Sequence, residues 1–459
     1  MRALWVCTLI VFLLCIEVVG QGGQKFSYDS DLLPSTFFSD NRNRLRELMP
    51  ENSVAVFFSS PVRNRANDVN YVYHQDPDFY YLTGYRDPDA VLFVFKEPVL
   101  LPTGNKISER IIVRKRNEKR ELWTGRIATP EEVTGISGII DAMTSDNNEA
   151  FKLPFKKFKK ALLSKVPEGV VNDPYDPYEL SDIMERIGKK LKFETGALEQ
   201  FMASLREIKK PEELILLQKA VDISVEGHLR MMDSVRTGWL EYQVEAVGEY
   251  VFHHSGAEDI GYPSICGAAE NGCVLHYEKN RRKAGDGDLI LLDMGAEYHG
   301  YTADITRTLP VNGIFSEPQR SLYDLVWEAQ KAGIDSCVAG KDFKAPHRAA
   351  MEVIQEGLIK LEIIKEKSQA KKYFPHGTSH YLGLDVHDPG NYEELKPGQV
   401  ITVEPGIYIP EGSDCDPKWW NIGIRIEDDI LITDKEPVNM SGTLPSRSDL
   451  LEKRLKSGK

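Results

Sequence analysis

Two segments in the second half of the chain repeat one pattern, and this repeat restricts the possible folds more than any other feature. Residues 289–295 (LILLDMG) and 400–406 (VITVEPG) are each an apolar, strand-like run that ends in an acid, with a glycine two residues later. A second strand-like segment with another acid follows, after 11 residues in one case and 23 in the other, which fits hairpin-like returns and excludes a shared helix face. A duplicated unit that faces itself would bring four acids to one centre. These acids are Asp293, Asp304, Glu404 and Glu427.

The residues in front of the strand-end acids predict that the carboxylates are buried. The pair LL precedes Asp293, and the pair TV precedes Glu404. An ionised carboxylate in a low-dielectric site must be paired or must bind a cation, and few cationic residues lie nearby in the sequence. For any one acid, a salt bridge or a surface position is the simpler explanation. Four acids in two echoing contexts favour a metal site.

Three histidines within twelve positions supply a further group of candidate ligands. They lie in the segment HGTSHYLGLDVHD, although the chain has only 10 histidines in 459 residues, and they are His376, His380 and His387. The glycines between them indicate close packing at a site. Only one histidine is needed as a ligand, because the others can orient groups or bind developing charge.

Four carboxylates and one imidazole form a hard, oxygen-rich donor set. Such a set is suited to Mn²⁺, and it resembles a thiolate-type zinc site less. Acids shared between two ions about 3.5 to 4 Å apart give the arrangement of two-metal hydrolases, in which a water between the ions loses its proton near neutral pH. Arg425 lies two residues before Glu427, on the same face of a predicted strand, and can steady a ligating acid.

These residues carry a resemblance to a known family. The segments SICGAAENGCVLHY, DGDLILLDMGAEYHGYTADITRTLPVNG, HGTSHYLGLDVHD, VEPGIYI and NIGIRIEDDI resemble the Xaa-Pro aminopeptidases (aminopeptidase P) of the dinuclear pita-bread metallopeptidases. In the first half, DPDFYYLTGYRDPDAVLFV and ELWTGR resemble the N-terminal domain that accompanies this family. The resemblance implies an α/β (α+β) fold, in which an N-terminal α/β domain precedes a pseudo-symmetric pita-bread domain.

The resemblance also implies a role for each candidate residue. The family's five metal ligands fall on Asp293, Asp304, His380, Glu404 and Glu427, and the implied cofactor is two divalent ions, with Mn²⁺ favoured. Asp304 and Glu427 would bridge the ions, Asp293 would bind one ion, and His380 with Glu404 would bind the other. Glu404 would also carry the proton from the nucleophile to the leaving nitrogen.

Four further residues match family positions outside the ligand set. His276, His376 and His387 would polarise the scissile carbonyl and hold the substrate beyond the cut bond, and Arg425 matches an arginine that contacts a ligand.

The implied substrates are peptides with proline in the second position, which lose their first residue. Proline forms a tertiary amide without an N–H group, so the site needs a dedicated cavity for the ring. The family pattern implies that the N-terminal domain, together with a neighbouring subunit, restricts the cleft to free chain ends, and it implies a homo-oligomer, a dimer or a tetramer. Two alternatives remain: a prolidase restricted to Xaa-Pro dipeptides, and a metal-free binding protein on the same scaffold. Phosphotriester hydrolysis is conceivable as a side activity.

Length and composition set the domain organisation. A chain of 459 residues predicts two domains, and the net charge of −13 argues against nucleic-acid binding. The change in pattern around residues 208–213 (IKKPEE), where proline opens a long amphipathic helix before a second helix at about 239–254, marks the boundary. We expect a signal peptide at 1–20, an N-terminal domain at 21–200, a catalytic domain at 205–445 and a C-terminal tail at 446–459.

The first twenty residues predict export. A short apolar run (LWVCTLIVFLLCI) follows Arg2 and stops at Glu17, and it is too short to span a bilayer. This pattern is typical of a secretory signal that is cleaved near Gln21, which leaves a periplasmic or secreted protein without stable membrane insertion. An uncleaved anchor is the alternative. Of the cysteines that remain, Cys266 and Cys273 are either a disulfide or, as we favour, buried small side chains.

The N-terminal half predicts a supporting α/β layer. Residues 53–60 (SVAVFFSS) and 90–95 (AVLFVF) read as strands, with a shorter apolar run at 111–113, and 129–132 (TPEE) reads as a capped helix start. Phe155, Phe158 and Leu162 recur at helical spacing among four lysines, which indicates a basic amphipathic helix whose lysines are solvated. A surface for lipid or nucleic acid is the alternative for this segment.

Overall fold

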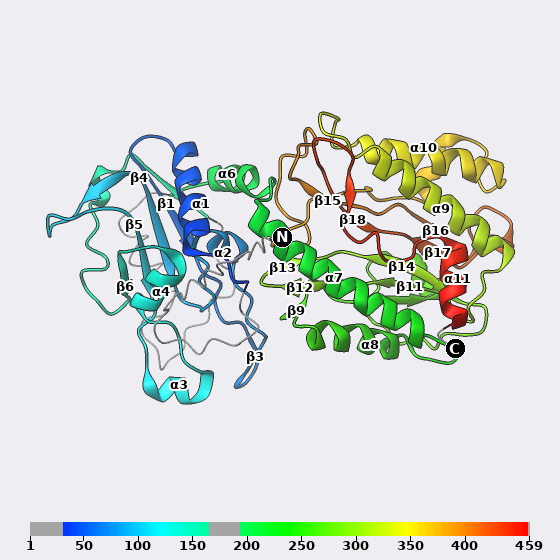
Figure 1. Ribbon diagram of the computed structural model, residues 1–459, viewed down its shortest axis with the longest axis horizontal. Coiled ribbons are helices and arrows are strands. Elements are labelled where there is room, and N and C mark those ends of the chain that lie inside the picture. Colours follow the sequence, from blue (N-terminus) through cyan, green and yellow to red (C-terminus); the bar gives the residue numbers. More distant parts are fainter. Residues whose placement is uncertain (1–30, 165–192, 458–459) are drawn as a thin grey trace, which may run out of the picture.

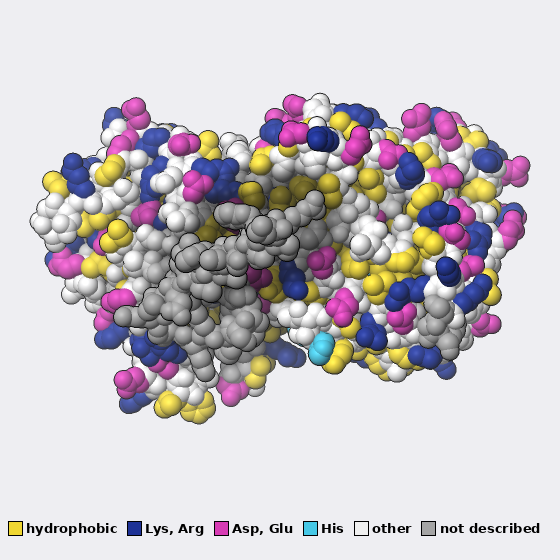
Figure 2. All heavy atoms as spheres, viewed as in Figure 1, with side chains coloured by type: hydrophobic (Ala, Val, Ile, Leu, Met, Phe, Trp, Pro, Cys, Tyr) yellow, Lys and Arg dark blue, Asp and Glu magenta, His cyan; other side chains and the backbone are white. Residues whose placement is uncertain are grey.

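The computed structural model describes residues 31–164 and 193–457, which form two lobes side by side (Figure 1). The predicted signal peptide and its anchor alternative lie outside these residues. Within the described part of the chain, no helix combines the length and the apolar composition that a membrane span requires. On the face drawn in Figure 2, acidic and basic side chains are interspersed over both lobes.

The N-terminal lobe is built on a mixed sheet, and five helices lie in the described part of this lobe. The strand order is β6 (Ala142–Thr144), β5 (Lys106–Val113), β4 (Val91–Leu100), β1 (Ser53–Phe58), β7 (Lys160–Leu163) and β8 (Phe193–Thr195). The helices are α1 (Ser35–Leu48), α2 (Pro77–Thr83), α3 (Glu118–Thr124), α4 (Pro130–Ser137) and α6 (Ala197–Arg206). A separate hairpin joins β2 (Asn64–Ala66) to β3 (Val69–Asn70).

Apolar residues on both faces of the central strands explain why this sheet is buried. Ala55 and Phe57 of β1 belong to the core that includes α1, whereas Val54 and Val56 face a second apolar cluster on the other side. This alternation follows from the two-residue repeat of a strand. The strands predicted at 53–60 and 90–95 are confirmed as β1 and β4, and the apolar run at 111–113 is the end of β5.

The local predictions for two other segments have opposite outcomes. The capped start of α4 is confirmed, because the Thr129 side chain accepts a hydrogen bond from Glu132 N–H and the Glu132 carboxylate accepts one from Thr129 N–H. The prediction of a basic helix around Phe155 is wrong: the segment forms a single 3₁₀ turn, η1 (Phe155–Lys157), and then strand β7. Phe155 and Phe158 lie against Phe93 and Phe95 of the sheet, so packing on the sheet overrides the helical spacing. The lysines around them are exposed.

Long helices cover the C-terminal lobe. They are α7 (Pro211–Ser234), α8 (Glu241–His254), α9 (Glu317–Asp335), α10 (Ala345–Lys360) and α11 (Ser448–Ser457). The two helices predicted after residue 208 are confirmed as α7 and α8. The predicted C-terminal tail at 446–459 contains α11, which packs on the lobe through buried Leu451 and Leu455.

Short antiparallel sheets lie between these helices and place the acids. The first group is β10 (Ile265–Ala268), β11 (Leu289–Asp293) and β14 (Thr306–Pro310), beside β9 (Asp259–Ile260), β12 (Ala296–Tyr298) and β13 (Tyr301–Thr302). The second is β15 (Val400–Val403), β18 (Asp428–Leu431) and β19 (Val438–Asn439), with β16 (Gly406–Ile409) paired to β17 (Ile422–Arg425). Three 3₁₀ turns complete the lobe: η2 (Ala269–Cys273), η3 (Lys367–Lys372) and η4 (Pro417–Trp419).

The predicted hairpin-like returns are confirmed: β11 pairs with β14, and β15 pairs with β18. One detail of the prediction is wrong, because Asp304 and Glu427 lie just before β14 and β18 rather than on a strand. At Gly295 a Cβ atom would lie 1.9 Å from the carbonyl oxygen of Ala303. Only glycine allows this close approach, which brings the backbone before Asp304 beside the end of β11.

All four cysteines of the described residues are free thiols. Cys266 is fully buried, and Cys273 is partly buried. The favoured interpretation of these two residues as small packed side chains therefore agrees with the structure better than a disulfide does.

Candidate metal centre

One pocket of about 440 Å³ collects every residue that the sequence singled out for chemistry. Both hairpin units contribute, together with the irregular segment between η3 and β15 that carries three of the histidines. Residues more than 150 positions apart in the sequence therefore meet in one place. The predicted residues that line this pocket are His276, Asp293, Asp304, His376, His380, His387, Glu404, Arg425 and Glu427.

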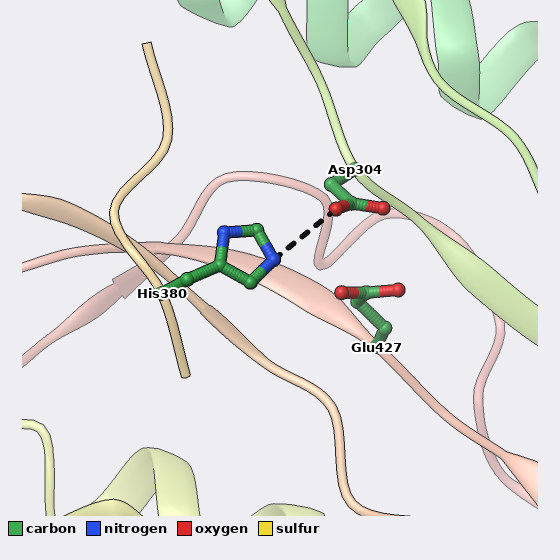
Figure 3. Close-up of side chains that lie close together, drawn as sticks. All are labelled: Asp304, His380 and Glu427. Atoms are coloured by element: carbon green, nitrogen blue, oxygen red, sulfur yellow. Dashed lines mark ion pairs between the residues drawn. The ribbon is translucent and has the colours of Figure 1, made fainter. Parts of the chain in front are cut away.

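Three of these side chains form the tightest group. Figure 3 shows the imidazole of His380 and the carboxylates of Asp304 and Glu427 directed toward one another. One donor atom from each lies within 4.8 Å of the other two, and His380 Nε2 is 3.4 Å from Asp304 Oδ2. Such spacing suits ligands around a cation.

Glu427 is the carboxylate that most needs a cation. Its side chain is buried, its Oε2 accepts a hydrogen bond from Thr306 Oγ1 at 2.6 Å, and its Oε1 has no hydrogen-bond partner among the described residues. Burial and, after it, the neighbouring carboxylate of Asp304 raise the pKa of Glu427 well above its ordinary value. A buried acid with an oxygen left over fits a metal ligand.

Asp293 is held from two sides. Tyr262 donates to its Oδ1 at 2.7 Å, and Arg425 donates to its Oδ2 at 2.5 Å. Burial raises the pKa of Asp293, although the guanidinium of Arg425 opposes this shift. Arg425 also donates to Tyr408 and Thr306, at 2.9 and 3.1 Å, so it steadies this acid as the sequence predicts.

Glu404 has a looser environment. Its oxygens lie 3.6 Å from His376 Nδ1 and 3.7 Å from His380 Nε2, which is longer than a hydrogen bond. Burial raises the pKa of Glu404 to about 7, against the effect of the charges on His380 and Arg425. A carboxyl group with this pKa can both accept and donate a proton near neutrality.

Asp304 and His380 shift each other in opposite directions. Burial acts to raise the pKa of Asp304, but the interaction with His380 outweighs it and lowers the pKa. Burial acts to lower the pKa of His380, but Asp304 and Glu404 raise it to about 9. The protonated imidazole of His380 thus provides a positive charge between acids. A bound cation would replace this charge, because histidine binds metal in its neutral form.

The remaining histidines surround this group. His376 Nε2 lies 2.8 Å from the hydroxyl of Tyr408, and burial, followed by the charge of Arg425, lowers the pKa of His376 to about 4. The ring of His387 packs edge-on against His380 at 4.4 Å between centroids, and burial and His380 lower the pKa of His387. His276 and His387 are exposed to the pocket. The neutral imidazoles of His376 and His387 can donate hydrogen bonds to a substrate carbonyl.

The sequence does not predict three residues of this centre: Tyr262, Thr306 and Tyr408. Each contacts an acid or a histidine through its hydroxyl group. In the sequence they read as ordinary strand or core residues. Their distance along the chain from their partners leaves no local pattern, apart from the position of Tyr408 in VEPGIYI, four residues after Glu404.

Two family models match this chain. Metallopeptidase family M24 matches residues 216–434, and the aminopeptidase P N-terminal domain matches residues 38–160. The first match contains all nine of the predicted pocket residues, and the second covers most of the described N-terminal lobe.

Individual relatives match over nearly the full chain. The Xaa-Pro aminopeptidase of Haemophilus influenzae is 36% identical over 420 residues, which cover 88% of this chain and 93% of that protein. The structure of Pseudomonas aeruginosa aminopeptidase PepP is 31% identical, with a TM-score of 0.83, and covers 93% of this chain and 99% of that one. Escherichia coli aminopeptidase P with the inhibitor Pro-Leu is 30% identical, with a TM-score of 0.82 and the same coverage. The chain therefore belongs to the Xaa-Pro aminopeptidase (aminopeptidase P) family of the M24 metallopeptidases.

Proposed function

We propose that this protein is a metal-dependent Xaa-Pro aminopeptidase, which hydrolyses the bond between an N-terminal residue and a penultimate proline. The observation that carries this function is the convergence of four acids and three histidines in one pocket of a chain that belongs to this family. The pocket also contains His276 and Arg425.

The donor set fits two divalent cations. Asp293, Asp304, His380, Glu404 and Glu427 would hold them, and the oxygen-rich set favours Mn²⁺. When bound, the ions would supply an activated water and Lewis-acid polarisation of the scissile carbonyl. The buried free oxygen of Glu427 and the group of three donors within 4.8 Å support this assignment.

The other groups of the pocket would handle protons and the substrate. Glu404, with a pKa raised to about 7, would take a proton from the nucleophile and pass it to the proline nitrogen. His276 and His387 are exposed side chains of the pocket lining, and they would donate hydrogen bonds to the developing oxyanion. His376, paired with the Tyr408 hydroxyl, would hold the substrate beyond the cut bond.

The proposed substrate follows the relatives. Escherichia coli aminopeptidase P binds the inhibitor Pro-Leu, which has the proline and the next residue of such a substrate but lacks the residue that is removed. Binding of the same fragment here would place proline beside the metal-binding acids.

A peptide series tests the proposal. Purified protein loaded with Mn²⁺ is expected to release arginine from Arg-Pro-Pro, and to leave Arg-Ala-Pro, the matched control, uncut. A chelator should abolish the reaction, and added Mn²⁺ should restore it. Failure to cut Arg-Pro-Pro at any metal concentration would overturn the function.

The prolidase alternative makes a different prediction in the same series. Cleavage of Arg-Pro together with inertness toward Arg-Pro-Pro would identify a dipeptidase. The relatives named above are aminopeptidases, which disfavours this outcome. A metal-free binding protein is also disfavoured, because all five ligand positions carry residues that can bind metal.

Location and assembly complete the proposal. We infer from residues 1–20 that the protein is exported to the periplasm or secreted. From the family resemblance we infer that it forms a dimer or a tetramer. Sequencing the N-terminus of protein purified from the periplasm or the medium should give Gln21 or a neighbouring residue. Light scattering of the metal-loaded protein should give a mass of two or four chains, and a monomer would contradict the oligomer.

A further inference from the structure

A buried ion-pair network lies beside the metal centre, at the junction of the two lobes. Its central residue is Arg206, the last residue of α6, which lies where the chain passes from one lobe to the other (Figure 1). Arg206 donates to Asp388 Oδ1 at 2.5 Å, to Asp78 Oδ1 at 2.7 Å and to Asp385 Oδ2 at 2.8 Å. Lys209 adds a bond to Asp388 Oδ2 at 2.7 Å.

The network fixes the Asp388 carboxylate completely. The side chains of Asp388 and Lys209 are each 1% exposed, and that of Arg206 is 4% exposed. Oδ1 of Asp388 also accepts a hydrogen bond from Asp385 N–H at 3.2 Å. A Cβ atom on Gly383 would lie 2.6 Å from Asp388 Oδ2, so the loop is folded tightly around this carboxylate. Buried ion pairs contribute little net stability, because removing their charges from water costs free energy. Specific positioning of Asp388 is therefore a better explanation for the network than stabilisation of the fold.

Asp388 connects directly to two histidines of the metal centre. It follows His387 in the chain, and its N–H donates to the carbonyl oxygen of Tyr381 at 3.0 Å. The same carbonyl oxygen lies 3.0 Å from His380 Nδ1. The rings of His380 and His387 pack against each other, so a shift of Asp388 would move both imidazoles.

We propose that Asp388, held by Arg206 and Lys209, is a positioning residue that sets the imidazoles of His387 and His380 in the metal centre, and that the Arg206–Asp78 bond ties this setting to the N-terminal lobe. None of the network residues lines the pocket itself, so the network acts on the site through the 381–388 segment. Asp78 belongs to α2, and its bond makes the placement of the N-terminal lobe part of the geometry of the site. The inference rests on the proposed function for its kinetic readout.

The first test compares three variants of the full-length, Mn²⁺-loaded enzyme on Arg-Pro-Pro. Asp388→Asn is expected to lower kcat about 10- to 100-fold with little change in KM, the usual size of a lost contact behind a metal-site histidine. Asp342→Asn is the matched control: it breaks an exposed pair with Arg348 and should leave kcat unchanged. Asp78→Asn, which leaves Arg206 paired with Asp388, should lower kcat about three- to tenfold.

A double-mutant cycle separates positioning from general structural damage. In a His387→Ala background, Asp388→Asn should cause a much smaller further loss of kcat than in the wild type, because its effect passes largely through His387. Equal factors in the two backgrounds would overturn the proposal. So would a folded Asp388→Asn enzyme with wild-type kcat.

A second readout needs no turnover. In metal-free protein with labelled histidines, Asp388→Asn should shift the imidazole resonances of His387 and His380, and Asp342→Asn should not. If Asp388→Asn does not fold, Asp78→Asn decides by the same two measurements, and unchanged kcat and resonances there would overturn the link to the N-terminal lobe. If the wild type cuts no Xaa-Pro peptide while the resonances still shift, the proposed function fails and the positioning role stands.

Discussion

Asp293 and Glu404 occupy equivalent places, at the ends of β11 and β15, but their surroundings differ. Both oxygens of Asp293 accept short hydrogen bonds, from Tyr262 and Arg425. The oxygens of Glu404 lie at least 3.6 Å from the nearest histidine nitrogens. The two hairpin units therefore place their acids in the same way, at the end of a strand. Only the second unit leaves its acid, Glu404, free to exchange protons.

The second acid of each unit shows a different relation. Asp304 pairs with His380 from the second half, and Glu427 accepts a hydrogen bond from Thr306 of the first half. The backbone N–H of Glu427 also donates to the carbonyl oxygen of Thr306 at 3.1 Å. Each unit thus completes the other, which explains why a single unit could not form the centre alone.

The largest expected effect tests the special place of Glu404. Glu404→Gln keeps the size of the side chain but removes the negative charge of the proposed ligand and proton carrier, so kcat on Arg-Pro-Pro should fall by about 10³-fold or more. Exposed Glu411, changed to Gln, is the control in the same region and should have wild-type kcat. Steady-state kinetics with elemental analysis of bound metal measures both; retention of a tenth of the wild-type rate would remove Glu404 from the proton path.

The next effect compares the histidines that the two halves contribute. His276→Ala and His387→Ala should each lower kcat by about 10² to 10⁴-fold with metal retained, since each loses the proposed hydrogen bond to the transition state. His254→Ala, on the exposed end of α8, should have no effect. Loss of bound metal in either pocket variant would show that the histidine is a ligand and that the present division of roles is wrong.

A smaller effect tests the clamp on Asp293. Arg425→Lys keeps the charge but cannot donate at once to Asp293, Tyr408 and Thr306, because lysine lacks the planar fork of arginine. Activity or metal affinity should fall about 10- to 100-fold. Titration of the metal-free protein with Mn²⁺ measures the affinity, and the exposed Arg447→Lys is the control. Unchanged activity and affinity would mean that Asp293 needs no support.

The outcome of the sequence analysis follows from how local each signal is. The strands β11 and β15, the acids at their ends and the histidine segment carry their patterns within a few residues, so they were predictable. The hydroxyl partners Tyr262, Thr306 and Tyr408 were not, because each contributes through a contact with a distant segment. The bond from Arg206 to Asp388 spans 182 residues and leaves no trace in either neighbourhood.

The wrong predictions have the same origin. The segment around Phe155 and Phe158 has helical spacing, but aromatic contacts with β4 decide its structure. Asp304 and Glu427 lie in segments that read as strands in the sequence, whereas the strands begin one or two residues later. Tertiary contacts override local preference most easily in short segments of this kind.

The smallest expected effect concerns the contact between the lobes rather than the contact between the halves. His74 Nε2 lies 2.9 Å from Glu297 Oε2 of β12, and this bond raises the pKa of His74 to about 9, although burial acts against it. A raised pKa stabilises the folded state below the ordinary value of about 6.5, and the stabilisation disappears as the pH rises through about 9. Because the His74 side chain is 52% exposed, solvent screens the pair and the effect should be slight.

Thermal unfolding should show that the Tm of the wild type falls more steeply between pH 7 and 10 than that of His74→Gln, whereas exposed His253→Gln should follow the wild type. Parallel curves for His74→Gln and the wild type would mean that this contact, unlike the network at Arg206, contributes nothing to joining the lobes.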